Sequence, residues 1–186
     1  MPFERRELNT DRLLLRPWSL TDIEDAFAYG SDPEWGRYLW ETPYPYTYQD
    51  AATFVAMASN DPWETRALYA IELGGRAIGG VRMYVTDVQG GIAGMGFNLA
   101  PVHWGRGYAS EAAGAVLAYG FEAAGLHRVF ATVDSRNVAA LRVVERLGMS
   151  REGVLRHHHF HLGEYADEVV YGILSNEWRA VGAAAL

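Results

Sequence analysis

Hydrophobic residues recur with a period of 2 in some segments of the chain and with a period of 3.6 in others. The two patterns together predict a mixed α/β domain. Val81, Met83 and Val85 keep the period of 2 that is typical of a strand. From residue 107 the period is 3.6, which predicts a helix that ends before Gly125. The predicted strands are 12–16, 66–73, 76–86, 92–100, 127–133, 150–160 and 167–174. The predicted helices are 19–30, 47–58, 107–123 and 137–147. The segment 31–46 is expected to be an irregular loop.

The length of 186 residues fits one domain covering 1–186, because no repeat, linker or long charge run divides the chain. The absence of cysteine excludes disulfides, thiolate nucleophiles and cysteine-based zinc sites, and it favours a cytoplasmic location. No apolar run approaches the roughly 20 residues needed to cross a bilayer, so no membrane association is expected. The net charge of −7 argues against a general nucleic-acid binder, which needs a concentrated basic face.

A glycine-bearing loop carries the strongest chemical signal in the chain. It joins a predicted strand to the longest predicted helix and reads His103-Trp104-Gly105-Arg106-Gly107-Tyr108-Ala109. Glycines let backbone amides approach a ligand, and the unpaired amides of a first helical turn favour an anion such as pyrophosphate. Ser110 breaks the dinucleotide-binding spacing and no Lys-Ser/Thr pair follows, which disfavours both nucleotide motifs. The alternative is that the glycines only form a tight strand-to-helix turn.

This loop resembles the acyl-CoA pyrophosphate loop of the GNAT acetyltransferases, Gln/Arg-x-x-Gly-x-Gly/Ala, at Gly107 and Ala109. Trp104 stands where that pattern has Gln or Arg, but Trp-Gly-Arg-Gly-Tyr-Ala is similar to the form in the ribosomal-protein N-terminal (alanine/serine) acetyltransferase branch. The resemblance to this branch extends over residues 10–178, through Thr10–Pro17, Asn137, Glu145–Met149, Glu152–Arg156, Asp167, Val170-Tyr171 and Glu177-Trp178.

The resemblance implies the GNAT fold, a mixed and mostly antiparallel central sheet with a splayed strand pair, flanked by about four helices. It also implies acetyl-CoA as co-substrate, with its pantetheine chain in the gap of the splayed pair. The backbone amide of Leu99 would donate to the thioester carbonyl, where amine attack gathers negative charge. Asn137 would contact the pantetheine arm, although Asn is also a good helix cap. The implied cofactor-binding residues are Phe97, Asn98, Leu99, Trp104, Gly105, Arg106, Gly107, Tyr108, Ala109 and Asn137.

The catalytic acid and base do not carry over from the family. Val144 stands at the position of the tyrosine that protonates the leaving thiolate in many GNAT enzymes, and Ala140 stands at that of a serine common in the related branch. Gly94 is nearest in register to a strand glutamate found in many members. Loose candidates for proton transfer are Tyr108, Glu41, Asp134 and His161, and a water chain to solvent is an alternative base.

Four histidines lie close together near the end of the chain. Alternation along a strand predicts that His157, His159 and His161 share one face. No metal is expected, because the GNAT reaction needs none and the nearby Glu164 and Asp167 have no recognisable ligand spacing. A pH-sensitive role in a substrate cleft is favoured instead.

The leading hypothesis is an N-acetyltransferase in which a neutral primary amine attacks acetyl-CoA directly. The acceptor is the N-terminus of a protein or a small-molecule amine. A catalytically silent acyl-CoA-binding module is the alternative, because the usual Tyr and Ser are missing, and a metal-dependent enzyme built on the histidines is a third possibility. The sequence leaves open the acceptor and whether the chain is a monomer or a homodimer.

Overall fold

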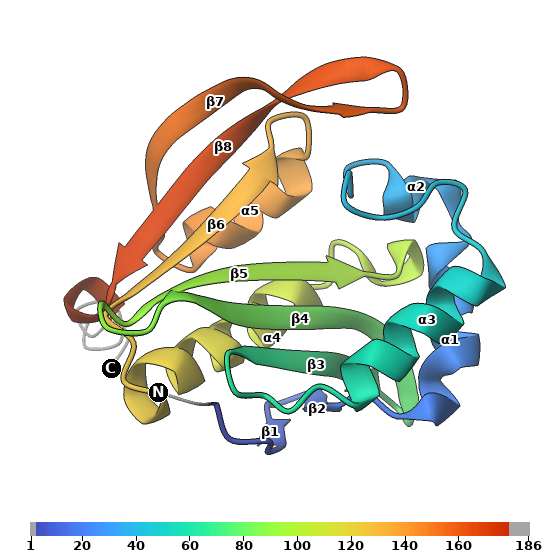
Figure 1. The fold of residues 1–186 in the computed structure, drawn as a ribbon, viewed down its shortest axis with the longest axis horizontal. Coiled ribbons are helices and arrows are strands. Elements are labelled where there is room, and N and C mark those ends of the chain that lie inside the picture. The colour runs from blue at the N-terminus through green and yellow to red at the C-terminus, as the bar shows by residue number, and fades with distance from the viewer. Residues whose placement is uncertain (1–2, 179–186) are drawn as a thin grey trace.

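The computed structural model describes residues 3–178 and contains one mixed sheet in the order β1-β2-β3-β4-β5-β6-β8-β7 (Figure 1). Its strands are β1 (Leu8–Asn9), β2 (Leu14–Pro17), β3 (Arg66–Leu73), β4 (Arg76–Asp87), β5 (Ile92–Leu99), β6 (Arg128–Asp134), β7 (Ser150–His161) and β8 (Glu164–Leu174). Its helices are α1 (Ile23–Gly30), α2 (Pro33–Gly36), α3 (Tyr48–Ser59), α4 (Tyr108–Ala118) and α5 (Val138–Arg146). The predicted α/β class is confirmed.

The predicted splayed strand pair lies at the centre of the sheet. β5 and β6 run parallel and pair only from Ile92 to Gly94, whereas the other neighbouring strands pair antiparallel. Beyond Gly94 the two strands separate, as Figure 1 shows. The second half of β5, from Met95 to Leu99, therefore has a backbone edge that β6 does not cover.

Helices cover both faces of the sheet, and each face has its own apolar core. Val116 and Leu117 of α4 are fully buried against Met83 in the larger core. On the opposite face, Val55 of α3 packs in a smaller core with Leu68. Burial of side chains of this size stabilises the fold by about 1.5–3 kcal/mol each. The two cores fix β4 and β5 between them.

The helix starts follow the predicted capping chemistry. Thr47 Oγ1 accepts a hydrogen bond from the amide of Asp50 (3.2 Å), and the Asp50 carboxylate accepts one from the amide of Thr47 (2.9 Å). This reciprocal pair satisfies two backbone donors that the first helical turn cannot use. Gly125 follows the α4 segment with φ +67°, as expected for a residue that ends a helix.

Three local predictions differ from the structure. The segment 31–46 contains the short helix α2, because Asp32 caps its first turn and Pro33 occupies its first position. The helix predicted over 107–123 is α-helical only to Ala118 and continues as a π-helical segment, Tyr119–Ala123. β1 was not predicted, so the sheet has an additional short edge strand.

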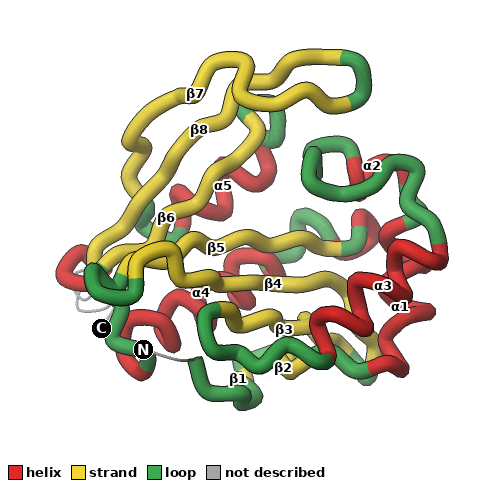
Figure 2. The backbone as a smooth tube through the Cα atoms, viewed as in Figure 1, coloured by secondary structure: helices red, strands yellow, loops and turns green. Residues whose placement is uncertain are grey.

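The β7–β8 hairpin extends from the body of the molecule toward α2 (Figure 2). His161 Nε2 lies 3.0 Å from the carbonyl oxygen of Gly36, and Trp40 Nε1 donates to Glu168 (3.2 Å). These contacts join the hairpin to the segment 31–46.

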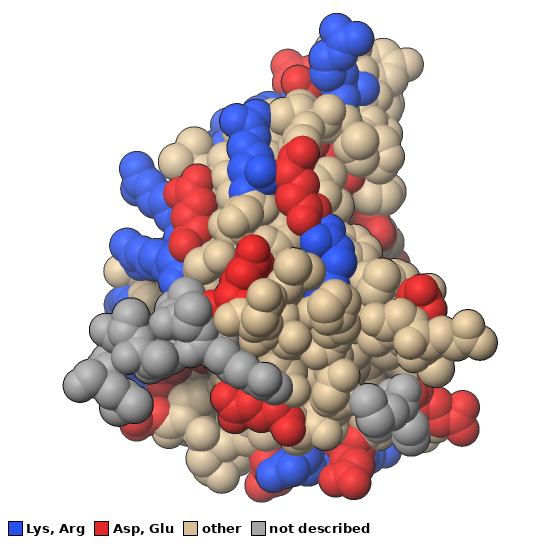
Figure 3. Space-filling view, turned by 90° about the vertical axis from the view of Figure 1, so that its left-hand side faces the viewer, with Lys and Arg blue, Asp and Glu red and all other residues tan. Residues whose placement is uncertain are grey.

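Two properties of the surface and the helices bear on the expected partners. Arginine and acidic side chains are interspersed on the face that Figure 3 shows. None of the helices within residues 3–178 combines the length and apolar character required to cross a bilayer.

Candidate functional site

Two cavities meet at the second half of β5. The first, which we call the loop cavity, measures about 680 Å³ and is lined by the loop 103–110 and the start of α5. The second, the sheet cavity, measures about 560 Å³ and is lined by β4, β5, β6 and the segment 38–41. Residues lining both are Tyr38, Leu39, Phe97, Asn98, Asn137 and Ala140. A long ligand in the loop cavity can therefore present its end to a second molecule in the sheet cavity.

Two glycines shape the wall of the loop cavity. Gly105 and Gly107 have φ values of +75° and +82°, in the left-handed region that favours glycine. A Cβ atom at Gly105 would have no neighbour within 4 Å, so its backbone is open to an approaching ligand. Gly107 immediately precedes α4, whose first-turn amides have no helical partner. The loop thus presents backbone donors at the positive end of a helix, as an anion site requires.

Two polar side chains that the sequence did not single out also line the loop cavity. Ser110 Oγ and His103 Nδ1 are buried and have no hydrogen-bond partner among the described residues. Burial lowers the pKa of His103, and the positive charge of Arg106 lowers it further. Buried polar atoms without partners are rare and indicate a missing ligand or water. The sequence feature that could have identified Ser110 is a hydroxyl-bearing residue directly after the Gly-x-Ala sequence of the loop.

Arg12 holds the loop in place from the N-terminal region. Its Nη1 donates to the carbonyl of Arg106 (3.0 Å), its guanidinium lies 4.6 Å from the centre of the Tyr108 ring, and it forms an ion pair with Glu111 (2.6 Å). Tyr108 lines the loop cavity, whereas Arg106 is exposed and lines neither cavity. The backbone of Arg106 is thus fixed within the loop, but its side chain does not reach either cavity.

The backbone of β5 offers donors to the gap between the splayed strands. The amide of Ala100 donates to the carbonyl of Ile78 (2.8 Å), and donors alternate between the two edges of a strand. The amides of Phe97 and Leu99 consequently point away from β4, toward the edge that β6 leaves uncovered. Trp104 Nε1 donates to the carbonyl of Leu99 (2.7 Å), which fixes the indole against the end of β5 and against the loop cavity.

Asn137 has a capping role that leaves half of its amide group free. Its Oδ1 accepts a hydrogen bond from the amide of Ala140 (3.0 Å) at the start of α5. The side-chain Nδ2 donates no hydrogen bond to another described residue, and Asn137 lines both cavities. The oxygen can serve the helix while the nitrogen serves a ligand, so the two predicted roles do not exclude each other.

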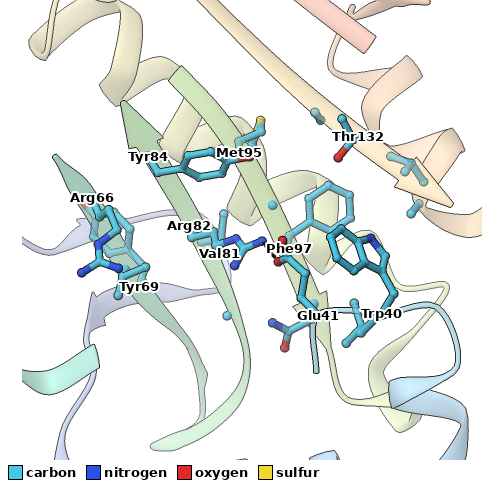
Figure 4. A pocket seen from close by; sticks show the side chains of 18 of the residues that line it. Trp40, Glu41, Arg66, Tyr69, Val81, Arg82, Tyr84, Met95, Phe97 and Thr132 are labelled. Atoms are coloured by element: carbon cyan, nitrogen blue, oxygen red, sulfur yellow. Dashed lines mark hydrogen bonds and ion pairs between the residues drawn. The ribbon is translucent and has the colours of Figure 1, made fainter. Parts of the chain in front are cut away.

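The sheet cavity combines aromatic and charged side chains (Figure 4). Trp40 and Glu41 come from the segment before α3, and Arg82 and Tyr84 come from β4. Arg82 and Glu41 form an ion pair of 2.6 Å. Burial raises the pKa of Tyr84, although the charge of Arg82 opposes this. Tyr84 is therefore neutral at physiological pH and can donate a hydrogen bond.

The four loose candidates for proton transfer do not come together in one cavity. Glu41 and Asp134 line the sheet cavity, Tyr108 lines the loop cavity, and His161 lines neither because its ring is buried against Gly36. Burial alone would raise the pKa of Asp134, but hydrogen bonds from Arg136 and His159 lower it overall. Asp134 is therefore a weak base. Glu41 is half-exposed and paired with Arg82.

The prediction that His157, His159 and His161 share one face is wrong. The register of β7 shifts between Leu155 and His159, and His157 has φ +49°. This irregularity turns His157 outward, where its ring stacks on Tyr165. His159 and His161 are buried.

Sequence reasoning also missed Glu168, a buried carboxylate that lines the sheet cavity. It accepts a hydrogen bond from Trp40 and lies 2.8 Å from His158 Nδ1. It is the partner of Asp134 in the β6–β8 register. No motif marks an acidic residue on a strand as buried, so only the fold reveals its position.

Comparison with known proteins gives consistent matches. The model of the acetyltransferase (GNAT) domain matches residues 12–150. The uncharacterized N-acetyltransferase p20 of Bacillus licheniformis is 30% identical over 92% of this chain and 97% of its own length. The uncharacterized N-acetyltransferase YnaD of Bacillus subtilis is 33% identical over 92% of this chain and 98% of its own length. A crystal structure of a GNAT-family acetyltransferase from Bacillus anthracis superimposes with a TM-score of 0.82 at 30% identity, covering 92% of this chain and 99% of that one.

Two further matches concern ligands of related proteins. The spermidine N(1)-acetyltransferase of Escherichia coli is 26% identical over 89% of this chain and 88% of the relative. The microcin C7 self-immunity acetyltransferase MccE, solved in complex with acetyl-CoA and AMP, shares the fold with a TM-score of 0.75 at 18% identity, covering 88% of this chain and 93% of that one. The matches thus include a spermidine acetyltransferase and do not single out the ribosomal-protein branch.

Proposed function

The chain belongs to the GNAT family of acetyl-CoA-using N-acetyltransferases, and from this premise we propose that it acetylates a single primary amine, the N-terminus of a protein or peptide. The observation that carries the proposal is the meeting of the two cavities at Phe97, Asn98 and Asn137. Acetyl-CoA lies in the loop cavity and the acceptor enters the sheet cavity. The thioester then sits where the cavities join.

The cofactor is held mainly by backbone groups in this proposal. The amides from Gly105 to Ala109, with the hydroxyl of Ser110, bind the pyrophosphate. The pantetheine arm lies along the uncovered edge of β5 and accepts a hydrogen bond from Asn137 Nδ2. The uncovered edge of β5 serves the bound cofactor as it would serve an added strand, with the amide of Leu99 reserved for the thioester carbonyl.

The reaction is a direct transfer. The lone pair of the neutral amine attacks the thioester carbonyl carbon, and the backbone amide of Leu99 donates to the carbonyl oxygen as its negative charge grows. A C–N bond forms and the C–S bond breaks. The proton lost by the amine passes through water in the open sheet cavity, and the CoA thiolate takes up a proton.

The charges of the sheet cavity favour an acceptor with one amine over a polyamine. A polyamine brings further positive charges that need free carboxylates. Within residues 3–178, each carboxylate that lines this cavity already has a partner: Glu41 pairs with Arg82, Asp134 with Arg136, and Glu168 with His158. The resemblance to the ribosomal-protein branch supports the N-terminal acceptor independently.

An acceptor screen tests the proposal. Thiol release from acetyl-CoA is measured with peptides that begin with Ala or Ser, with the same peptides blocked at the N-terminus, with spermidine and with a small monoamine. We expect turnover on the free peptides and none on the blocked ones. A clear preference for spermidine would overturn the proposed acceptor, and CoA binding without turnover on any amine would favour the silent module.

Direct transfer is tested separately by searching for an acetylated enzyme, and the amino-acid composition limits the side chains that could carry the acetyl group. The combined count of lysine and arginine is 16 and all of these are arginines, so the chain has neither lysine nor cysteine side chains to react with acetyl-CoA. Rapid-quench mass spectrometry during turnover is expected to show no acetylated side chain. An acetyl-enzyme that forms and decays as fast as the product appears would contradict direct transfer.

A further inference from the structure

A cluster of metal-ligating side chains lies on the β7–β8 hairpin beside the sheet cavity. One ring nitrogen of His158, one of His159 and one carboxylate oxygen of Glu168 lie within 4.8 Å of one another. We propose that His158, His159 and Glu168 bind a divalent transition-metal ion, with Zn²⁺ as the expected occupant. Neither the acetyl transfer nor the family resemblance requires such a site.

The environment of His159 points to a cation. Its side chain is only 4% exposed, and its Nε2 lies 3.2 Å from the Asp134 carboxylate. A carboxylate can only accept, so Nε2 carries a proton, and in the neutral tautomer Nδ1 then holds a lone pair. That Nδ1 is buried and has no hydrogen-bond partner among the described residues. A buried lone pair facing no donor is costly, and a metal ion would satisfy it.

The surroundings already orient the ligands. Asp134 holds the far nitrogen of His159, and Arg136 in turn pairs with Asp134 (2.7 Å). Trp40 donates to one oxygen of Glu168 (3.2 Å), which leaves the other oxygen to face His158 Nδ1 at 2.8 Å. Histidine ligands in metal sites typically donate their second nitrogen to a carboxylate, and such partners are part of the site.

The donor set selects the class of metal. Two imidazoles and one carboxylate suit Zn²⁺, which binds such ligands at about 2.0–2.2 Å, and three protein ligands leave a fourth position for water. His158 Nδ1 donates to Glu168 across 2.8 Å, so the ion takes the place of this proton, which is released to solvent, and the gap widens slightly to admit the ion. His158 is half-exposed and provides the entry side.

A bound ion would connect two parts of the acceptor region. Trp40 stacks on the ring of His159, with ring centres 5.3 Å apart and planes inclined by 16°, and it also binds Glu168. Fixing these two ligands therefore fixes Trp40, which forms part of the sheet cavity wall. The ion would stabilise the contact between the segment 31–46 and the hairpin.

The test measures Zn²⁺ binding directly and does not depend on acetyl transfer. Protein without a histidine tag is treated with chelator, transferred to metal-free buffer and titrated with ZnCl₂ by calorimetry. We expect saturation at one Zn²⁺ per chain and a higher Tm in its presence. Absence of saturable binding would overturn the proposal.

Three variants and a matched control locate the site. His158→Ala changes a half-exposed ligand and is expected to weaken Zn²⁺ binding more than tenfold, as is Glu168→Gln. Asp134→Asn removes a supporting carboxylate and is expected to weaken it by about 10- to 100-fold. The control His157→Ala removes an adjacent exposed histidine outside the cluster and should bind Zn²⁺ as the unmodified protein does. Unchanged affinity in His158→Ala, or an equal loss in His157→Ala, would refute the assignment.

Discussion

At the scale of single residues, Asn137 is the most informative position because one side chain can serve both a helix and a ligand. Asn137→Asp keeps the oxygen that accepts from Ala140 but replaces the free donor with a negative charge beside an anionic cofactor. We expect the KM for acetyl-CoA to rise by about tenfold, corresponding to roughly 1.4 kcal/mol, with thermal stability nearly unchanged because Asp caps as well as Asn. Steady-state kinetics and a thermal melt measure the two effects.

Two controls separate capping from ligand binding. Asn137→Ala removes both groups and should cost about 1 kcal/mol of stability. Thr47 lines neither cavity, so Thr47→Ala, which removes the cap of α3, should lose similar stability while leaving the KM for acetyl-CoA unchanged. If Asn137→Asp leaves acetyl-CoA kinetics unaltered, Asn137 is a structural residue only.

Residue-level prediction from the sequence works where a residue type and its local position carry the role. Gly105 and Gly107 have left-handed φ values and Asn137 caps α5, as their residue types and positions in the sequence predict. Ser110 and Glu168 were missed because their significance depends on burial beside a cavity. Chemical type alone does not reveal burial.

At the scale of elements, the loop before α4 is expected to bind the cofactor through its backbone. Gly105→Val places a side chain in open space on the wall of the loop cavity, where the pyrophosphate is proposed to lie. We expect CoA affinity to fall by more than tenfold, because the side chain blocks the approach to the amides. Calorimetric titration with CoA measures the effect.

The chain contains a matched control for backbone strain. Gly75 lies in the β3–β4 hairpin turn with φ +82°, close to the +75° of Gly105, and a Cβ atom there would also meet nothing within 4 Å. Gly75→Val should therefore lose similar stability but keep its CoA affinity. Equal affinities of the two variants for CoA would show that the loop is not part of the cofactor site.

Element boundaries were predicted well where the hydrophobic period is long. β3 and β4 begin at the predicted residues, since each fills a full run of strand formers beside a glycine turn. β1 has only two residues, too few to establish a period. The outward turn of His157 was not predictable either, because the register shift in β7 has no marker in the sequence.

At the scale of the whole molecule, stability should depend on pH through carboxylates that accept hydrogen bonds in the folded state. The pKa of Asp134 is lowered from its ordinary 3.8, because hydrogen bonds from Arg136 and His159 outweigh the effect of burial. The pKa of Glu111 is lowered from its ordinary 4.5 in the same way, by hydrogen bonds from Thr10 and Arg12. The folded state thus binds fewer protons than the unfolded state. This stabilisation is present above about pH 5 and is lost as the pH falls through the folded-state pKa values.

Thermal melts between pH 7 and pH 3 check this linkage. We expect Asp134→Asn to lower the Tm at pH 7 and to flatten the decrease toward acid pH, because the variant has no carboxylate left to protonate there. The exposed Asp11 provides the control, and Asp11→Asn should keep the full pH dependence. A profile for Asp134→Asn parallel to that of the unmodified protein would show that other groups cause the acid loss.

The pH dependence of catalysis tests which kind of amine is the acceptor. Only the neutral amine has a lone pair for attack, so kcat/KM should rise with pH until the free acceptor has lost its proton. A peptide N-terminus has a pKa of about 7.7–8.0, whereas an alkylamine such as a lysine side chain titrates near 10.4. With an Ala-starting peptide we therefore expect kcat/KM to be half-maximal near pH 8 and to level off about one pH unit higher, whereas a continued rise toward pH 10 would indicate an alkylamine as the reacting group. A profile independent of pH would contradict rate control by the neutral amine.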